Sequence, residues 1–334
     1  MNDSAVALNP FLDLLRSDRP LLADGAMGTS LFALGLISGD CPERWNIETP
    51  QRVVEVHRGY IRAGCDIILT NSFGGNGYRL KLHGLEGQVH QLNEAAAQLA
   101  CSTALETDRS IVVAGSMGPT GELLEPMGTM SPEACAAAYA DQAKGLDAGG
   151  VDVLWLETLS DIGEVRAALA GIRSVSELPV VVTMSFDTNG RTMMGLTATD
   201  MAEELLALGV DAFGANCGNN LADTEEAVRQ LMQAAPQIPI VSKANAGIPQ
   251  WHDDGLVYSG TPEVMAAHAH RLHELGVRII GGCCGSTQDH IATMRQVIDG
   301  ELDPPDIPAP RPEPRPTRTA PSSRRTRRGR AGRG

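Results

Sequence analysis

The feature that most restricts the fold of this chain is an alternation of short apolar runs with longer amphipathic stretches. Stretches with helical spacing and good helix formers occupy residues 95–105, 132–148, 162–172, 199–208, 224–234 and 262–275. Apolar runs that read as buried strands lie between most of them, at 21–23, 66–70, 111–114, 152–156, 180–184, 211–215, 239–242 and 278–281. Strands that alternate with helices in this way predict an α/β protein with a parallel sheet.

A repeated helix end favours closure of that sheet into a barrel. The segments 62–66, 148–152, 207–211 and 274–278 each end a helix on glycine, then pass through an apolar and a polar residue into a strand. Glycine adopts the left-handed conformation of a helix C-terminus at low cost. Because the repeats precede every second predicted strand, they predict a (βα)8 TIM barrel, with an open doubly wound sheet as the alternative.

The C-terminal segment differs from the rest of the chain in composition. From Asp303 onward prolines give way to an arginine-rich run at 322–330 with almost no apolar residues. Such a segment cannot bury a core, so we expect a barrel domain over 1–302 and a disordered Pro/Arg-rich tail over 303–334. The tail serves solubility or, alternatively, contacts RNA or an acidic surface.

Charge and cysteine content narrow the partners and the compartment. The net charge is −14, and nine arginines against four acids after residue 300 leave −19 on residues 1–300. So acidic a body argues against nucleic acid as the ligand of the barrel. The chain shows no signal-peptide pattern and no apolar run of about 18 residues, so we expect a cytoplasmic protein that avoids membranes. Its seven cysteines are then reduced, buried or metal-bound.

Polar and cysteine residues follow the predicted strands. Catalytic residues of βα barrels lie at the carboxyl ends of the strands. Strands six to eight are neighbours, and strand eight closes onto strand one. We therefore expect one mouth to be rimmed by residues from these ends and from strand four: Asp24, Gly25, Glu157, Cys217, Asn245, Cys283 and Cys284.

The three cysteines of this set form a candidate metal site. A closed structural zinc site usually has four ligands in CxxC pairs, and the sequence has none. Three ligands with one open position is the catalytic pattern, and the glycines around Cys283 and Cys284 permit the sharp turn that adjacent ligands need. Two buried cysteines in a glycine-rich turn, or a phosphate-binding loop after strand eight, are the alternatives.

A zinc ion on three thiolates retains little positive charge, so it activates water weakly. It still binds a substrate thiol as the thiolate, which supplies a nucleophile at neutral pH. This chemistry predicts S-alkylation of a substrate thiol, with no nucleophile from the protein.

Asp24 and Glu157 suit proton transfer or the binding of a substrate ammonium. The alternative for Asp24 is a turn residue before Gly25, and for Glu157 an N-cap or a core hydrogen bond with Thr158. The other cysteines have no partner pattern, and we expect buried apolar residues at Cys41, Cys65, Cys101 and Cys135.

Taken together, these motifs resemble a known family. The resemblance runs from Leu21 to Ile298 and rests on six segments: 24–29, 70–74, 115–119, 157–158, 214–217 and 281–285. They are similar to the homocysteine S-methyltransferases, which include the betaine–homocysteine methyltransferases and the homocysteine-binding module of cobalamin-dependent methionine synthase.

The resemblance implies a (βα)8 barrel that makes methionine from homocysteine with Zn2+ on Cys217, Cys283 and Cys284. It also implies that Asp24, Gly25 and Glu157 hold the amino-acid end of homocysteine. Asn245 falls where related modules place a residue close to the metal. A homo-oligomer is possible.

The methyl donor is less determined than the acceptor. Segments 185–187 and 190–195, with the arginine-rich tail, resemble bacterial enzymes described as betaine-dependent, so betaine is the first expectation. S-methylmethionine or another sulfonium, and methylcobalamin, are the alternatives.

A quaternary ammonium favours aromatic faces. The animal betaine enzymes carry an aromatic residue where this chain has Gly74, and the aromatic candidates here are Trp45, Phe73, Tyr78 and Phe186. Outside this class, the chain would be a non-catalytic zinc-holding binding protein that acts through its basic tail.

Overall fold

The computed structural model describes residues 9–186, 190–252 and 255–310. Its centre is one parallel eight-stranded sheet in the order β1-β10-β7-β6-β5-β4-β3-β2. A bridge between Ala23 and Ile67 brings the two edge strands together, so the sheet closes as a TIM barrel. The strands are β1 (Leu21–Leu22), β2 (Ile67–Leu69), β3 (Val112–Met117), β4 (Val153–Leu159), β5 (Val180–Met184), β6 (Ala212–Cys217), β7 (Ile240–Ala244) and β10 (Ile279–Gly282).

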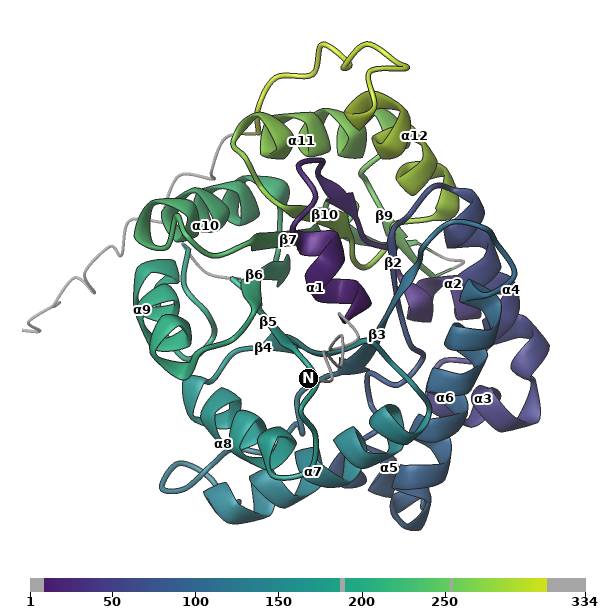
Figure 1. The fold of residues 1–334 in the computed structure, drawn as a ribbon, viewed down its shortest axis with the longest axis vertical. Coiled ribbons are helices and arrows are strands. Elements are labelled where there is room, and N and C mark those ends of the chain that lie inside the picture. The colour runs from purple at the N-terminus through teal and green to yellow at the C-terminus, as the bar shows by residue number, and fades with distance from the viewer. Residues whose placement is uncertain (1–8, 187–189, 253–254, 311–334) are drawn as a thin grey trace, which may run out of the picture.

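Helices surround the barrel on its outer side (Figure 1). Shorter elements in the loops are α2 (Met27–Ala33), η1 (Pro42–Arg44), α3 (Trp45–Glu48), α5 (Gly77–Lys81), η2 (Glu86–Gln88) and the hairpin β8 (Pro249–His252)–β9 (Gly255–Tyr258). The outer helices are α4 (Pro50–Arg62), α6 (Val89–Ala104), α7 (Pro132–Ala148), α8 (Ile162–Arg173), α9 (Ala198–Leu208), α10 (Leu221–Ala234), α11 (Pro262–Glu274) and α12 (Gln288–Ile298).

The structure confirms the predicted barrel and rules out the open doubly wound sheet. The repeated glycine ends also adopt the expected geometry, since Gly64, Gly150, Gly209 and Gly276 have φ angles of 98°, 92°, 64° and 85°. The sequence analysis gave no range for two outer helices, α4 and α12, although the glycine end at 62–66 implied a helix before it.

The predicted tail is only partly covered. Residues 303–310 form no helix or strand, and the carbonyl of Ile307 accepts a hydrogen bond from Arg271 on α11 at 3.3 Å. Residues 311–334 lie outside the described residues, so the domain division at residue 302 stays a prediction. In the described part of the chain, no helix is long and apolar enough to cross a membrane.

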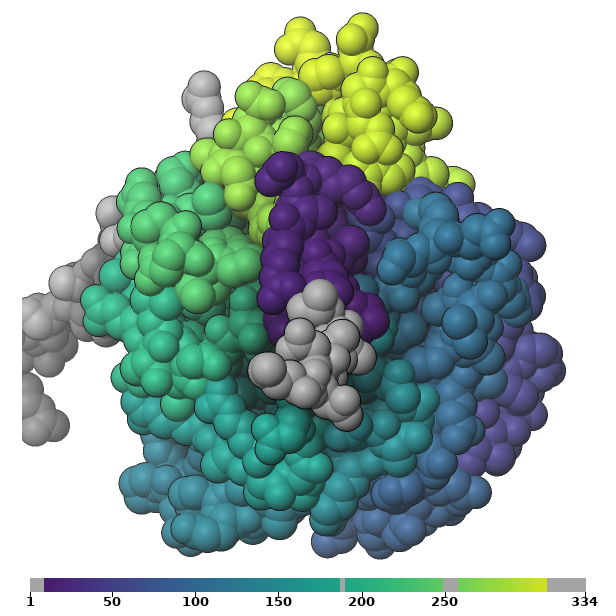
Figure 2. Space-filling model, in the orientation of Figure 1, coloured from purple at the N-terminus to yellow at the C-terminus, as the bar shows by residue number. Residues whose placement is uncertain are grey.

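A short N-terminal helix, α1 (Pro10–Leu15), closes the amino end of the barrel. Figures 1 and 2 show it lying across the centre of the ring. Its Phe11 side chain is fully buried among inward-facing strand residues such as Leu21 and Trp155. Burial of a phenylalanine contributes about 2–3 kcal/mol, and Arg278 adds hydrogen bonds to the carbonyls of Leu14 and Leu15. The barrel is therefore filled at this end.

Candidate active site

The opposite, carboxyl end of the strands opens into a cavity of about 630 Å³. Six of the seven predicted site residues line it, and the seventh, Asn245, is bonded to the two loops that carry the cysteines. Gly25 has no room for a side chain, because an added Cβ there would lie 2.8 Å from the carbonyl oxygen of Ser286 and 2.9 Å from the Tyr60 hydroxyl. The lining includes Asp24, Gly25, Glu157, Cys217, Lys243, Cys283 and Cys284.

The three predicted cysteines converge. Their Sγ atoms all lie within 4.8 Å of one another, and the Cys217 and Cys283 sulfurs are 3.1 Å apart. Left-handed backbone at Cys217 (φ 58°), at Gly218 and at Gly285 turns both loops toward the cavity. Left-handed conformation costs energy at a residue other than glycine, so Cys217 is strained where it presents its sulfur.

These sulfurs fit a zinc ion. A tetrahedron with Zn–S bonds of about 2.3 Å places its sulfurs about 3.8 Å apart, within the range that the cluster spans. Among the described residues no histidine or carboxylate completes the cluster, which leaves a fourth position open. Hydrogen bonds from Cys217 and Cys283 lower the pKa of Cys284, and hydrogen bonding with its two neighbours raises the pKa of Cys217.

The loop after β10 does not suit a phosphate. A phosphate loop offers free backbone N–H groups to its ligand. Here the four N–H groups of residues 283–286 all donate within the protein, to Ala244 O (2.8 Å), Asn245 Oδ1 (3.0 Å), Thr29 Oγ1 (3.2 Å) and Cys283 O (3.0 Å).

Asn245 holds the two cysteine loops together. Its amide nitrogen donates to Gly218 O at 2.7 Å, and its oxygen accepts from the backbone of Cys284 at 3.0 Å. Asn216 likewise makes two hydrogen bonds to Thr158, whose backbone is also left-handed (φ 63°). These two amides fix the strand ends that present the sulfurs.

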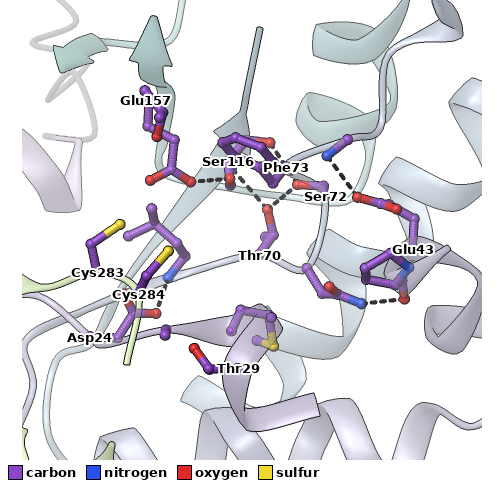
Figure 3. A pocket seen from close by; sticks show the side chains of 18 of the residues that line it. Asp24, Thr29, Glu43, Thr70, Ser72, Phe73, Ser116, Glu157, Cys283 and Cys284 are labelled. Carbon is purple, nitrogen blue, oxygen red and sulfur yellow. Dashed lines mark hydrogen bonds between the residues drawn. The ribbon is translucent and has the colours of Figure 1, made fainter. Parts of the chain in front are cut away.

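The two predicted carboxylates have different surroundings. Glu157 accepts a short hydrogen bond from Ser116 Oγ (Figure 3). The Ser116 backbone N–H donates to Thr70 Oγ1, its carbonyl accepts from Ser72 Oγ, and the Thr70 and Ser72 hydroxyls bond to each other. The expected alternative, a core hydrogen bond with Thr158, is not the contact that Glu157 makes. Burial raises the pKa of Glu157 to about 7, against the opposing effect of a nearby ammonium group.

Asp24 forms a buried ion pair that the sequence analysis missed. Lys243 on β7 places Nζ 2.7 Å from Asp24 Oδ1, with both side chains at most 3% exposed. Burial lowers the pKa of Lys243, but the charges of Asp24 and Glu157 outweigh burial and raise it, so the ammonium stays charged. The sequence signal for this ion pair was the lysine at position 243 within the mostly apolar strand 240–244.

The far side of the cavity carries charged and aromatic groups. Figure 3 places Glu43 across the cavity from the cysteines. Phe73 lines the cavity, whereas the Trp45 ring is covered by Arg52 at 4.9 Å and Phe186 is buried. Of the four predicted aromatic contacts, Phe73 is the one that lines this cavity.

Three of the remaining cysteines are buried as expected, namely Cys41, Cys65 and Cys135. Cys101 is half-buried and donates to the carbonyl of Gly150 at 3.2 Å.

Comparisons with known proteins give the family. The profile described as homocysteine S-methyltransferase matches residues 21–298. The chain belongs to the homocysteine S-methyltransferase family. It is 34% identical over 302 residues to methionine synthase of Mycobacterium tuberculosis and 33% identical over 303 residues to that of Mycobacterium leprae. These matches cover 86% of this chain and 25% of each relative, so this chain spans about a quarter of their length.

Solved structures agree. The metallated form of the homocysteine methyltransferase MmuM from Escherichia coli matches with a TM-score of 0.73 and 27% identity, over 86% of this chain and 99% of that one. A methyltransferase from Methanosarcina mazei has a TM-score of 0.57 at 11% identity, over 87% of this chain and 98% of that one, which shows a shared fold.

Proposed function

We propose that this protein is a zinc-dependent homocysteine S-methyltransferase that forms methionine. The observation that carries the proposal is the convergence of three sulfurs and two carboxylates in one cavity. The sulfurs suit a metal that binds a thiol, and the carboxylates suit the ammonium of an amino acid. The relationship to MmuM supports homocysteine as the acceptor.

Each group has a defined task in this proposal. Cys217, Cys283 and Cys284 would hold the ion, and bound Zn2+ would lower the pKa of the substrate thiol so that it binds as a thiolate. Asp24, Gly25 and Glu157 form the part of the cavity that holds the amino-acid end. Asn245 keeps the two cysteine loops in register.

Betaine is the donor we propose. The substrate sulfur forms a bond to the methyl carbon while the bond from carbon to the quaternary nitrogen breaks, which leaves a tertiary amine. The cavity of about 630 Å³ has room for the acceptor and the donor together. Phe73 and Glu43 suit a quaternary cation, and Arg79, also on the lining, suits a carboxylate.

A sulfonium such as S-methylmethionine is the second choice of donor, and methylcobalamin is the third. Most of the rate would come from alignment of sulfur and methyl group and from exclusion of water. We also propose that the protein acts in the cytoplasm.

A donor panel tests the proposal. Purified protein with one zinc per chain is mixed with homocysteine and either betaine, S-methylmethionine or methylcobalamin, and methionine is measured. We expect betaine to give the fastest turnover. Cys217→Ser and Cys283→Ser should reduce both zinc content and turnover, whereas Cys101→Ser should retain both.

Other outcomes favour other functions. If no donor yields methionine and the arginine-rich tail binds a partner tightly, the protein is a zinc-holding binding protein. If metal-free protein is fully active, the zinc assignment is wrong.

A further inference from the structure

Lys243 is an ionisable residue in an unusual place. It projects from β7, where it pairs with Asn216 of β6 and Gly281 of β10, and its side chain is 3% exposed. The side chain runs past Gly281 of the neighbouring strand, where an added Cβ would lie 3.1 Å from Lys243 Cγ. Glycine at that position leaves the space that the lysine occupies.

The two carboxylates near Lys243 differ in the oxygens they leave free. Asp24 Oδ1 accepts from Lys243 at 2.7 Å, and Asp24 Oδ2 accepts from the backbone N–H of Leu69 at 2.7 Å. Both oxygens of Asp24 are therefore engaged. Glu157 uses Oε1 for Ser116, and its Oε2 has no hydrogen-bond partner in the described part of the chain.

The charges of Asp24, Glu157 and Lys243 leave one negative charge without a partner, which a ligand cation can neutralise. Two buried carboxylates face one buried ammonium, so the group carries a net charge of −1 when all three are ionised. A buried carboxylate without a countercharge is strongly unfavourable. One ligand ammonium at Glu157 completes the balance, and a second would be repelled by Lys243.

We propose that Lys243 sets the way this cavity recognises the amino group of its substrate. It forms an internal ion pair with Asp24 and leaves Glu157 as the acceptor for a single ligand ammonium. Glu157 is then the residue that touches the substrate amino group, and Asp24 and Lys243 are positioning residues. This inference rests on the proposed function, because it assumes an amino-acid thiol as the ligand.

The inference predicts a pattern of ligand discrimination. L-homocysteine and 4-mercaptobutanoic acid share the thiol and the carboxylate, but the second lacks the amino group. A hydrogen bond to a charged group corresponds to a preference of about 10- to 100-fold. Wild-type protein should show this preference for homocysteine, and Glu157→Gln should reduce it to about twofold.

Two double variants separate the positioning residues from the contact residue. Asp24→Asn/Lys243→Met removes the internal pair together and should keep most of the preference, because Glu157 is intact. Glu157→Gln/Lys243→Met should regain much of it, because loss of the lysine frees Asp24 to accept the ligand ammonium. Lys144→Met, which removes an exposed lysine on α7, is the matched control for loss of a positive charge.

The experiment is calorimetric titration of each zinc-loaded variant with both thiols, after zinc content and circular dichroism establish folding. The inference is overturned if Glu157→Gln keeps the preference or if Asp24→Asn/Lys243→Met loses it. No donor is needed for binding, so the two proposals fail separately. The predicted binding pattern without methionine formation refutes the proposed function, and methionine formation with the wrong binding pattern refutes the inference.

Discussion

His57 makes the stability of this protein depend on pH in a predictable direction. The imidazole lies on α4 with no exposed surface, and neither ring nitrogen has a hydrogen-bond partner among the described residues. Burial alone lowers its pKa from 6.5 to about 4. The charged ring is therefore disfavoured only in the folded state.

The sign and size of the effect follow from proton linkage. Between pH 6.5 and 4 the unfolded chain binds a proton at His57 that the folded protein does not, so folding stability falls as the pH falls. With these two pKa values the loss from this one residue is about 2 kcal/mol between pH 8 and pH 5. Above pH 7.5 both states are neutral and the effect disappears.

Urea denaturation of metal-free, reduced protein at a series of pH values measures this effect. His57→Leu should lose about 2 kcal/mol less than the wild type between pH 8 and pH 5. His90→Gln, at an exposed histidine, should follow the wild-type curve. Parallel curves for His57→Leu and wild type would show that His57 binds its proton equally in both states and refute the reasoning.

Three further changes test the packing around the site. Lys243→Met should cost about 3–5 kcal/mol in urea denaturation, whereas Asp24→Asn/Lys243→Met should lie close to wild type; equal losses would mean that the pair is not coupled. Gly285→Ala places a Cβ 2.3 Å from the Tyr258 ring at a φ of 79°, so zinc affinity should fall, and unchanged affinity would contradict the loop geometry. Thr197→Ala removes the N-cap of α9 and should cost about 1 kcal/mol, with no change in ligand binding.

Local patterns were enough to predict the barrel. Buried parallel strands read as continuous apolar runs, and the glycine helix ends mark where the next strand begins. The range of α4 was not predicted, although the glycine at residue 64 marked where it ends. Its Gly59 lies against Gln288 at the start of α12, and an added Cβ would clash at 1.9 Å. Glycine at position 59 weakens the helix pattern in the sequence, but it leaves the space into which Gln288 of α12 packs.

The sequence predicted which residues meet at the site, but not all of the contacts they make there. The rule that functional residues follow barrel strands placed the cysteines and carboxylates at one mouth, since the closing order of strands is fixed by the fold. The state of Asp24 was not predictable, because its partner Lys243 lies 219 residues away in sequence. Which oxygens remain free depends on such distant contacts.

The helix that fills the amino end of the barrel has a kinetic consequence. Phe11 fills the amino end, and the cavity opens at the carboxyl ends of the strands. The sulfurs and Glu157 lie on one side of this cavity, and Glu43 lies across from them (Figure 3). If the acceptor binds at the sulfurs and the donor lies over it, the acceptor must enter first and its methylated product must leave last. Steady-state kinetics of such a protein would follow a compulsory order, with the demethylated donor released before methionine.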